Sequence, residues 1–250
     1  MEWSITHIPE TDSTNRWLRD NAAAGCSGCS AQPAGGQPQQ EFGSVVVADY
    51  QTAGRGCGTN VWESERGKNL LFSILVRPDN LPASRQFHIS MAISVAICEA
   101  VGQLVGELSV KWPNDIYWRN AKLAGILIEN RLQGGVIRDS IVGVGLNVNQ
   151  RQFVSDAPNP VSLYQISQAE TSRTQLLNDI LESFGRLLHT DVHSRYMSML
   201  YRRRGFHPYA DADGAFMATI AGVEPDGHLL LDDDSGRCRR YAFKEVSFII

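Results

Sequence analysis

The sequence predicts an α+β fold, in which a mixed β-sheet carries helices on one face and a small β-barrel follows at the C-terminus. Three observations lead to this prediction. Strand-like segments occur in runs that are interrupted by helical segments only at intervals. A long apolar stripe at helical spacing starts at residue 173. After residue 205 the chain changes to short strand-like segments separated by glycine-containing turns.

The N-terminal part is expected to contain one helix, one long loop and two strands. Residues 12–21 read as the first turns of a helix, with Asp12 or Ser13 as its cap. Residues 22–43 are rich in Ala, Gly, Gln, Ser and Pro, and have too few bulky apolar side chains to order themselves. We expect a mobile surface loop there. Residues 44–48 and 70–77 read as strands, and Pro78 ends the second one.

The middle of the chain supplies the rest of the predicted sheet. Residues 84–104 have apolar side chains at helical spacing. Residues 108–112 read as a strand that ends at Pro113, and residues 116–118 and 123–129 read as the arms of a hairpin. Residues 136–149 read as a further strand or strand pair. We assign residues 1–204 to one large domain.

The C-terminal part is predicted to contain a helix and then a separate small domain. The helical stripe consists of Leu176, Leu177, Ile180, Leu181, Phe184, Leu187 and Leu188. Residues 205–250 are assigned to the small β-barrel, with strands at 215–223, 228–232 and 239–250. A unit of this size buries little apolar surface, so we expect it to dock on the large domain.

Composition and charge argue against several classes of protein. The chain has 250 residues and a net charge of -4, so it has no general basic field for DNA or RNA. Its five cysteines are irregularly spaced, which favours a reducing compartment; Cys26 and Cys29 have redox or zinc spacing but lack a second pair. The first residues do not resemble a secretory signal, and the apolar stretch at 89–105 is too short to span a bilayer. We expect a cytoplasmic protein with no membrane partner.

Two separated segments carry most of the functional information. The first, residues 51–58 (QTAGRGCG), offers backbone amides without neighbouring side chains, the guanidinium of Arg55 and, close by, the indole of Trp62. Such a loop suits phosphates and a flat base, although an ordinary hairpin has the same composition. It is neither a dinucleotide-binding motif nor a Walker loop, because the other parts of both motifs are missing.

The second segment runs from Lys111 to residue 125 and places Asn114, Asp115 and Lys122 around a tight bend. A carboxylate beside an amide suits Mg²⁺, and the two lysines suit an anion. The alternative is a solvated strand end. Together, the two segments indicate a protein that uses a nucleotide to activate another molecule.

Two further motifs have a functional and a structural interpretation. Residues 12–15 (DSTN) either cap a helix or direct hydroxyl and amide groups toward a small neutral polar head group. In residues 143–149 (GVGLNVN), glycines inside a strand indicate the close approach of a ligand or of another backbone. Asn147 either hydrogen-bonds a ribose or base edge or belongs to a turn at the strand end.

In order and spacing, these motifs resemble those of biotin protein ligases, which join biotin to the carboxyl-carrier subunit of carboxylases. The resemblance rests on residues 12–15, 51–56, 62, 111–115, 122–126 and 143–147 and covers nearly the whole chain. It implies a fold like that of biotin ligases and class II aminoacyl-tRNA synthetases, with residues 1–204 as the catalytic domain and an SH3-like barrel at the C-terminus. It also implies biotin and ATP as substrates, Mg²⁺ as cofactor and the biotin carboxyl carrier protein as partner.

The resemblance further implies roles for individual residues. Biotin would be bound by the helix start, the glycine loop and one lysine: Ser13, Thr14, Asn15, Gln51, Arg55, Gly56, Cys57 and Lys122. The nucleotide would be bound by Trp62, Lys111, Asn114 and Asn147. Lys122, Arg55 and Asp115 would act in catalysis, and Asp115 would also support Mg²⁺.

Three departures from the family pattern bear on these expectations. Cys57 stands where a second arginine commonly follows Gly-Arg-Gly, and a cysteine makes no bidentate bonds to a carboxylate or phosphate. The loop at 22–43 is long. The first motif begins close to Met1, so neither a winged-helix domain nor a DNA partner is expected. The oligomeric state stays open between monomer and homodimer, with residues 126–130 as a candidate pairing strand.

The implied reaction has two steps. The carboxylate of biotin attacks the α-phosphorus of ATP, giving biotinyl-5'-adenylate and pyrophosphate, and a lysine amine of the carrier protein then attacks the acyl carbon. This is the reaction of a biotin–[acetyl-CoA-carboxylase] ligase. Three alternatives remain: a lipoate– or octanoate–protein ligase of related fold, a non-enzymatic biotin-sensing regulator, and a nucleotide-binding domain without ligase activity.

Overall fold

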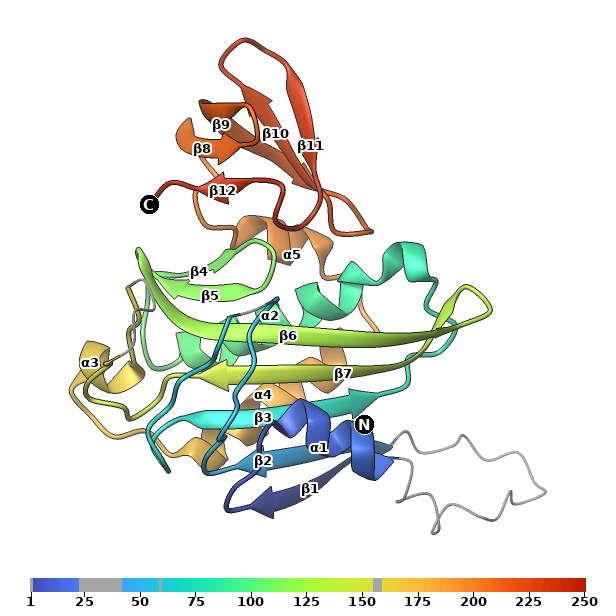
Figure 1. The fold of residues 1–250 in the computed structure, drawn as a ribbon, viewed down its shortest axis with the longest axis vertical. Helices are drawn as coiled ribbons and strands as arrows, with labels where there is room; N and C mark the ends of the chain where they lie inside the picture. The colour runs from blue at the N-terminus through green and yellow to red at the C-terminus, as the bar shows by residue number, and fades with distance from the viewer. Residues whose placement is uncertain (1, 23–41, 59, 155–158) are drawn as a thin grey trace.

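A seven-stranded mixed sheet forms the body of the molecule (Figure 1). The computed structural model describes residues 2–22, 42–58, 60–154 and 159–250. In order across the sheet, the strands are β1 (Glu2–Ile8), β2 (Phe42–Ala48), β3 (Leu70–Val76), β7 (Val136–Leu146), β6 (Ala121–Gln133), β5 (Asp115–Trp118) and β4 (Leu108–Lys111). Only β1 and β2 pair in parallel; the other neighbours are antiparallel. The mixed sheet is confirmed, whereas β1 was not predicted. Most of the expected loop at 22–43, including Cys26 and Cys29, lies outside the described residues.

The two long helices, α2 (Phe87–Gly102) and α4 (Arg173–Leu187), cover one face of this sheet. Nearly every side chain of α2 is buried, because this helix lies between the sheet and α4. The hydroxyl of Ser172 caps α4 by accepting a hydrogen bond from the amide of Gln175. Both helices agree with the sequence prediction.

Helix α1 (Thr14–Ala22) packs on the opposite face, near the β1 edge. It is held by a small apolar cluster that consists of Leu18, Val46, Leu75 and Ile141, with Trp17 packed against it. Side chains alternate along a strand, so the neighbours of Leu75 in β3 point to the large core on the other face. The prediction of helices on one face is therefore correct for the long helices, and α1 is the exception.

The longest strands of the sheet, β6 and β7, are joined by a turn at Gly134 and Gly135. Both glycines have positive φ, at 60° and 81°, as a two-residue hairpin turn of this hand requires. The segment predicted as one or two strands at 136–149 is the single strand β7, followed by an irregular segment.

A second, antiparallel sheet forms the C-terminal unit, in the order β11 (Cys238–Tyr241), β10 (Leu229–Asp233), β9 (Gly214–Val223), β8 (His207–Asp211) and β12 (Ser247–Phe248). Strand β8 was not predicted, and the single strand expected at 239–250 is wrong: it divides into β11 and β12 around a turn at 242–246. The indole N–H of Trp112 donates to the carbonyl of Gly227 at 2.9 Å, and Tyr209 belongs to the same apolar cluster as the large core. This unit therefore docks on the sheet, as expected. The domain boundary at 204/205 stays a prediction.

The short helices α3 (Leu163–Ser167) and α5 (His193–Ser198) complete the fold. Within the described residues, no helix combines the length and the apolar character that crossing a membrane requires.

Candidate functional site

The floor of the site is the face of the sheet that carries α1. Ser73 of β3 pairs with Gly143 of β7, while Gly145 pairs with Gly125 of β6, which in turn pairs with Asp115 of β5. Directly paired residues in neighbouring strands point to the same side of a sheet, so all five share this face. The glycines leave the middle of two strands without side chains, and other groups can lie directly on the backbone there.

Two side chains occupy the space above these glycines. A Cβ atom added to Gly143 would overlap the amide of Asn15, and one added to Gly145 would overlap the indole of Trp62. At Gly125, an added Cβ would lie 3.0 Å from the same indole. The sequence predicted that a ligand or another backbone approaches this strand; the structure instead places two side chains there.

The start of α1 presents buried hydroxyl and amide groups to the site. The Oε1 of Gln51 accepts hydrogen bonds from the amide of Thr14 at 2.8 Å and from its hydroxyl at 3.1 Å. Ser73 Oγ lies 2.7 Å from Thr14 Oγ1 and 2.6 Å from Asn15 Oδ1, and Asn15 Nδ2 donates to Glu129 at 2.9 Å. This network fixes the polar groups at one end of the site.

The glycine loop folds back on itself above the floor. The carbonyl of Gly54 accepts a hydrogen bond from the amide of Trp62 at 2.9 Å, and the amide of Gly56 donates to the carbonyl of Asn60 at 2.8 Å. The expectation of bare amides along this loop is therefore wrong at Gly56, whose N–H has an internal partner. Trp62 lies across the floor, and its Nε1 is buried without a hydrogen-bond partner among the described residues.

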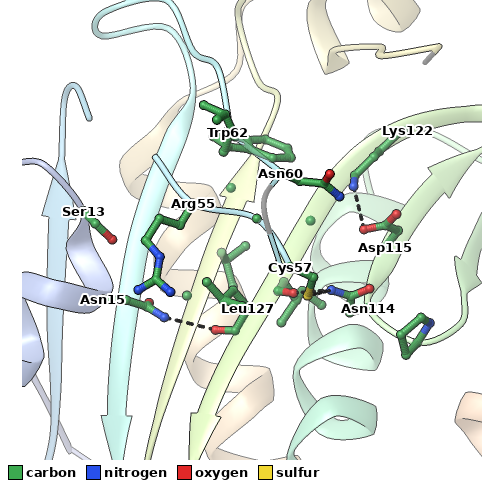
Figure 2. Close-up of a pocket in the computed structure, with 18 of the residues that line it drawn as sticks. Ser13, Asn15, Arg55, Cys57, Asn60, Trp62, Asn114, Asp115, Lys122 and Leu127 are labelled. Carbon is green, nitrogen blue, oxygen red and sulfur yellow. Dashed lines mark hydrogen bonds and ion pairs between the residues drawn. The ribbon is translucent and has the colours of Figure 1, made fainter. Parts of the chain in front are cut away.

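Positively charged side chains lie on both sides of the site. Lys122 Nζ lies 2.7 Å from Asp115 Oδ1 and 5.9 Å from the centre of the Trp62 ring. Arg55 Nη1 lies 3.5 Å from Glu129 Oε1. Figure 2 shows Arg55 beside Asn15 on one side of the cavity and the Lys122–Asp115 pair on the other.

Lys111 adds a third cation in a less polar setting. Its Nζ lies 4.9 Å from the ring centre of Phe248 and 5.5 Å from that of Tyr117. Burial of the ammonium lowers the pKa of Lys111, and the charge of Asp115 opposes that shift. Anionic groups bound nearby would therefore strengthen the charged form of this lysine.

Cys57 lies in the middle of the cavity, between its two ends (Figure 2). Its Sγ accepts a hydrogen bond from Asn114 Nδ2 at 2.9 Å, and the same amide group donates to the carbonyl of Ile126 at 2.6 Å. Burial is the main cause of a raised pKa for the Cys57 thiol, an effect opposed by Asn114 and by nearby ammonium groups. This position is thus occupied by a neutral group.

One cavity of about 190 Å³ brings the predicted residues together. The structure places in its lining Ser13, Thr14, Asn15, Gln51, Arg55, Gly56, Cys57, Trp62, Lys111, Asn114, Asp115 and Lys122. Asn147 is the exception: its Nδ2 donates to the carbonyl of Val161 at 3.0 Å, away from this lining. The Oδ1 of Asn147 is buried and unpartnered among the described residues.

Sequence reasoning missed several residues in or beside the cavity, among them Asn60, Val61 and Leu127 of its lining. Three others hold or complete the site. Ser73 is the single polar residue in the run LLFSILV of β3, and this contrast was an available signal. Glu129 follows an apolar segment of β6 and holds both Asn15 and Arg55. Phe243 also lines the cavity, although it belongs to the C-terminal unit, and no local pattern marks it.

Asp115 is the carboxylate that lines this cavity within the described residues. Mg²⁺ typically binds one or two carboxylates together with substrate phosphates and water, so a single carboxylate near two lysines suits a phosphate-bound ion rather than a closed protein cage. A separate cluster of Glu224, Asp226 and His228 lies in the C-terminal unit, where Arg240 pairs with both carboxylates.

Curated relatives share much of the sequence. The chain is 30% identical over 220 residues to the bifunctional ligase/repressor BirA of Bacillus subtilis, covering 80% of this chain and 65% of that protein. It is 32% identical over 179 residues to the biotin–[acetyl-CoA-carboxylase] ligase of Mycobacterium tuberculosis, covering 70% of this chain and 60% of that one. The chain thus spans less than two thirds of the length of either relative.

Solved structures share the fold. A biotin protein ligase from Aquifex aeolicus, in complex with biotin and ATP, matches with a TM-score of 0.74 at 23% identity, covering 98% of this chain and 97% of that chain. A biotin protein ligase from Leishmania major, in complex with biotinyl-5-AMP, matches with a TM-score of 0.64 at 21% identity, with coverages of 96% and 98%. The α+β prediction is confirmed by these likenesses. Residues 34–147 match the family model of the biotin/lipoate A/B protein ligases.

Proposed function

We propose that this protein is an ATP-dependent biotin protein ligase, which forms biotinyl-5'-adenylate and transfers biotin to a lysine of a carrier protein. The observation that carries the proposal is one cavity with a hydroxyl- and amide-lined end and a cation-lined end. A neutral polar ring and a carboxylate, joined by an apolar chain, match these two ends. The names of the relatives and the ligands of the solved structures agree with this assignment.

The neutral end would bind the ureido ring of biotin. Ser13, Thr14, Asn15 and Gln51 bring hydroxyl and amide groups to this end, and Ser73 orders two of them. Groups held in fixed orientations discriminate strongly against ligands that lack the matching donors and acceptors. Lipoate and octanoate have no ureido ring, so this end favours biotin over both.

The cationic end would support the first step. The biotin carboxylate forms a bond to the α-phosphorus of ATP, and the bond between that phosphorus and the leaving pyrophosphate breaks. Two anions must meet, so Lys122 at this end would offset their repulsion by placing positive charge beside the reacting oxygens, and Arg55 would add positive charge from the side of Asn15. Lys122 exchanges its contact with Asp115 for one with substrate. The glycine loop, including Gly56 and Cys57, would shield the adenylate from water.

Mg²⁺ is proposed as the cofactor, with Asp115 as its protein ligand. When bound, the ion would neutralise charge on the phosphates. Lys111 and Asn114 would bind the nucleotide at the same end, where the Lys111 ammonium lies near the rings of Tyr117 and Phe248.

Trp62 and Asn147 are proposed to serve the adenosine. Each keeps one buried polar atom without a partner among the described residues: the indole Nε1 of Trp62 and the Oδ1 of Asn147. Buried polar atoms are normally hydrogen-bonded, so the indole Nε1 of Trp62, which lines the cavity, marks a position where a ligand would complete the bonding. Asn147 lies outside that lining, so the adenosine would have to extend beyond it to reach Oδ1. An amino group on a base would satisfy Asn147.

The second step requires an entry for the acceptor lysine. A cavity of about 410 Å³ lies between the sheet and the C-terminal unit, and it shares Cys57, Asn114 and Phe243 with the first one. The incoming amine attacks the acyl carbon, AMP leaves, and the amine loses its proton; Asp115 is the proposed helper. A biotin carboxyl carrier protein in the cytoplasm is the proposed partner.

Mass spectrometry of an apo carrier domain tests this function. Incubation with the protein, biotin and Mg-ATP is expected to add one biotinyl group, and replacement of biotin by lipoate or octanoate is expected to add nothing. Transfer of lipoate or octanoate instead would replace the proposal by a lipoate-type ligase. An unmodified carrier, with no adenylate formed from biotin and ATP, would reject ligase activity, and a gel-shift with operator-like DNA would then test a regulatory role.

A further inference from the structure

The turn at residues 242–246 brings a cation of the C-terminal unit to the glycine loop. This turn joins β11 to β12 and lies on the side of the C-terminal sheet that faces the large sheet (Figure 1). A Cβ atom added to Gly58 would overlap the ammonium of Lys244, and its distance to Lys244 Cε would be 3.3 Å. Lys244 and the glycine loop are thus in direct contact, although 186 positions separate Gly58 from Lys244 in the sequence (244 minus 58).

The contact is built into the turn. The amide of Glu245 donates to the carbonyl of Ala242 at 3.2 Å, and the amide of Ala242 donates to the Glu245 carboxylate at 2.7 Å. Lys244 occupies the third position of this closed turn with φ 72°, a conformation that favours glycine. A long charged side chain in such a conformation is a marker of a functional position.

Phe243 fixes the turn against the large sheet. Its ring lies edge-on to Trp112, with 6.4 Å between ring centres, and Trp112 is itself anchored by its hydrogen bond to Gly227. Phe243 lines the functional cavity, and Lys244 Nζ lies 5.8 Å from the centre of its ring. The ammonium is therefore directed to the rim of the cavity by packing that the two units share.

Unlike Lys122 and Arg55, Lys244 has no carboxylate partner among the described residues. Lys122 pairs with Asp115, and Arg55 pairs with Glu129. Within the described ranges, no carboxylate lies within ion-pair distance of Lys244. Its charge acts on the Cys57 thiol together with that of Lys122, so both ammonium groups lie near the same part of the loop.

We propose that Lys244 is a phosphate-binding residue, which holds the part of ATP that leaves as pyrophosphate. This inference rests on the proposed function. Lys122 lies at the reacting end of the cavity, whereas Lys244 is exposed at the outer side of the loop beside Gly58. An unpaired, exposed ammonium loses little hydration when it binds an anion, and phosphate oxygens beyond the reacting atom would project toward this rim.

The test compares pyrophosphate binding by the wild-type protein and three variants in calorimetry. Lys244→Gly removes the charge and suits the positive φ, so it is expected to keep or raise the thermal stability while weakening pyrophosphate binding about tenfold. Lys244→Arg retains the charge and is expected to bind normally. Arg237→Ala removes an exposed cation of the same unit and is the matched control, with wild-type affinity expected.

Binding of AMP separates a local effect from a distorted site. AMP lacks the leaving phosphates, so its affinity is expected to be the same in the wild type and in Lys244→Gly. Equal pyrophosphate affinity in the wild type and Lys244→Gly, or no measurable pyrophosphate binding by the wild type, would overturn the assignment. A parallel loss of AMP affinity would overturn it too, because Lys244 would then only shape the cavity.

Biotin-dependent exchange of pyrophosphate into ATP distinguishes this inference from the function on which it rests. In an active wild type, Lys244→Gly is expected to raise the KM for ATP and pyrophosphate about tenfold with little change in kcat. A wild type without biotin-dependent exchange would reject the ligase, whereas the calorimetric comparison would still decide the role of Lys244.

Discussion

Lys122 Nζ and Asp115 Oδ1 lie 2.7 Å apart on neighbouring strands, at the cationic end of the cavity. This pair holds the Lys122 ammonium beside the floor at Gly125, where an added Cβ atom would lie 3.5 Å from Lys122 Nζ. The carboxylate is partly exposed, so it tolerates the loss of its partner. The proposed chemistry, by contrast, depends on the ammonium.

Lys122→Ala is therefore expected to fold normally and to lose adenylate formation by about 10²–10³-fold, the usual effect of removing one preorganised donor. Circular dichroism and thermal unfolding check the fold, and biotin-dependent pyrophosphate exchange measures the rate. Lys68→Ala, a lysine outside the cavity lining, is the matched control. Near-normal exchange in Lys122→Ala would contradict the assigned role.

Ser73 connects the two polar residues of α1 that are proposed to bind biotin. Ser73→Ala leaves Thr14 Oγ1 and Asn15 Oδ1 without their buried partner, so the free energy of unfolding should fall by about 1–3 kcal/mol and biotin affinity should decrease. Denaturant unfolding and calorimetry with biotin measure the two effects. Ser94→Ala is the control, because the buried hydroxyl of Ser94 has no partner among the described residues and its removal should cost little.

Gly143→Ala tests the floor. The added methyl group would overlap the amide of Asn15 and displace the start of α1, so we expect at least a tenfold loss of biotin affinity and a loss of about 1–3 kcal/mol of stability. Gly222→Ala in β9 is the matched strand substitution, because its new Cβ would lie at an ordinary contact distance of 3.9 Å from Leu230 Cδ1. Equal biotin affinity in both variants would show that the close approach at Gly143 is unimportant.

Asp233 makes the C-terminal unit sensitive to acid. Its carboxylate accepts hydrogen bonds from the Ser235 hydroxyl at 2.6 Å, from Arg239 Nε at 2.7 Å and from the Arg237 amide at 2.9 Å, and these bonds hold the pKa of Asp233 well below its usual range. A lowered folded-state pKa contributes stability above the unfolded-state pKa, roughly pH 4, and that stability is lost as the pH falls through the folded-state value.

Asp233→Asn should accordingly lower the Tm at pH 7 and flatten the fall of Tm between roughly pH 4 and pH 2. Differential scanning calorimetry across this range measures both. Asp234→Asn changes an exposed neighbour and should follow the wild-type profile. A wild-type acid profile in Asp233→Asn would mean that other carboxylates, such as Asp211, control the transition.

The sequence predicted the site best where the functional residues lie close together in the chain. Short motifs such as residues 51–58 and 111–115 place several functional groups within a few positions, and the sheet register then brings the motifs together at Gly125, Gly143 and Gly145. The long helices were predictable because their apolar spacing is internal to each segment. These features need no knowledge of the rest of the chain.

Features that depend on docking were not predictable. Exposed and half-buried side chains alternate only weakly along strand β1. This strand forms because it pairs in parallel with β2, which is distant in the sequence. The side of the sheet taken by α1 depends on which residues of β2 and β3 face it. Lys244 reaches the site because a whole unit docks through Trp112 and Phe243, which no local pattern encodes.

The modest apolar anchorage of α1 has a consequence for hydrogen exchange. Leu18 joins this helix to three sheet residues, Val46, Leu75 and Ile141, while the main core lies on the opposite face. The amides of α1 should thus exchange through a local opening that leaves α2 and α4 protected. A ligand bound between Asn15 and the strands would have to leave before α1 could open. Occupancy of the cavity should therefore slow deuterium uptake in α1 more than in the other helices and strands.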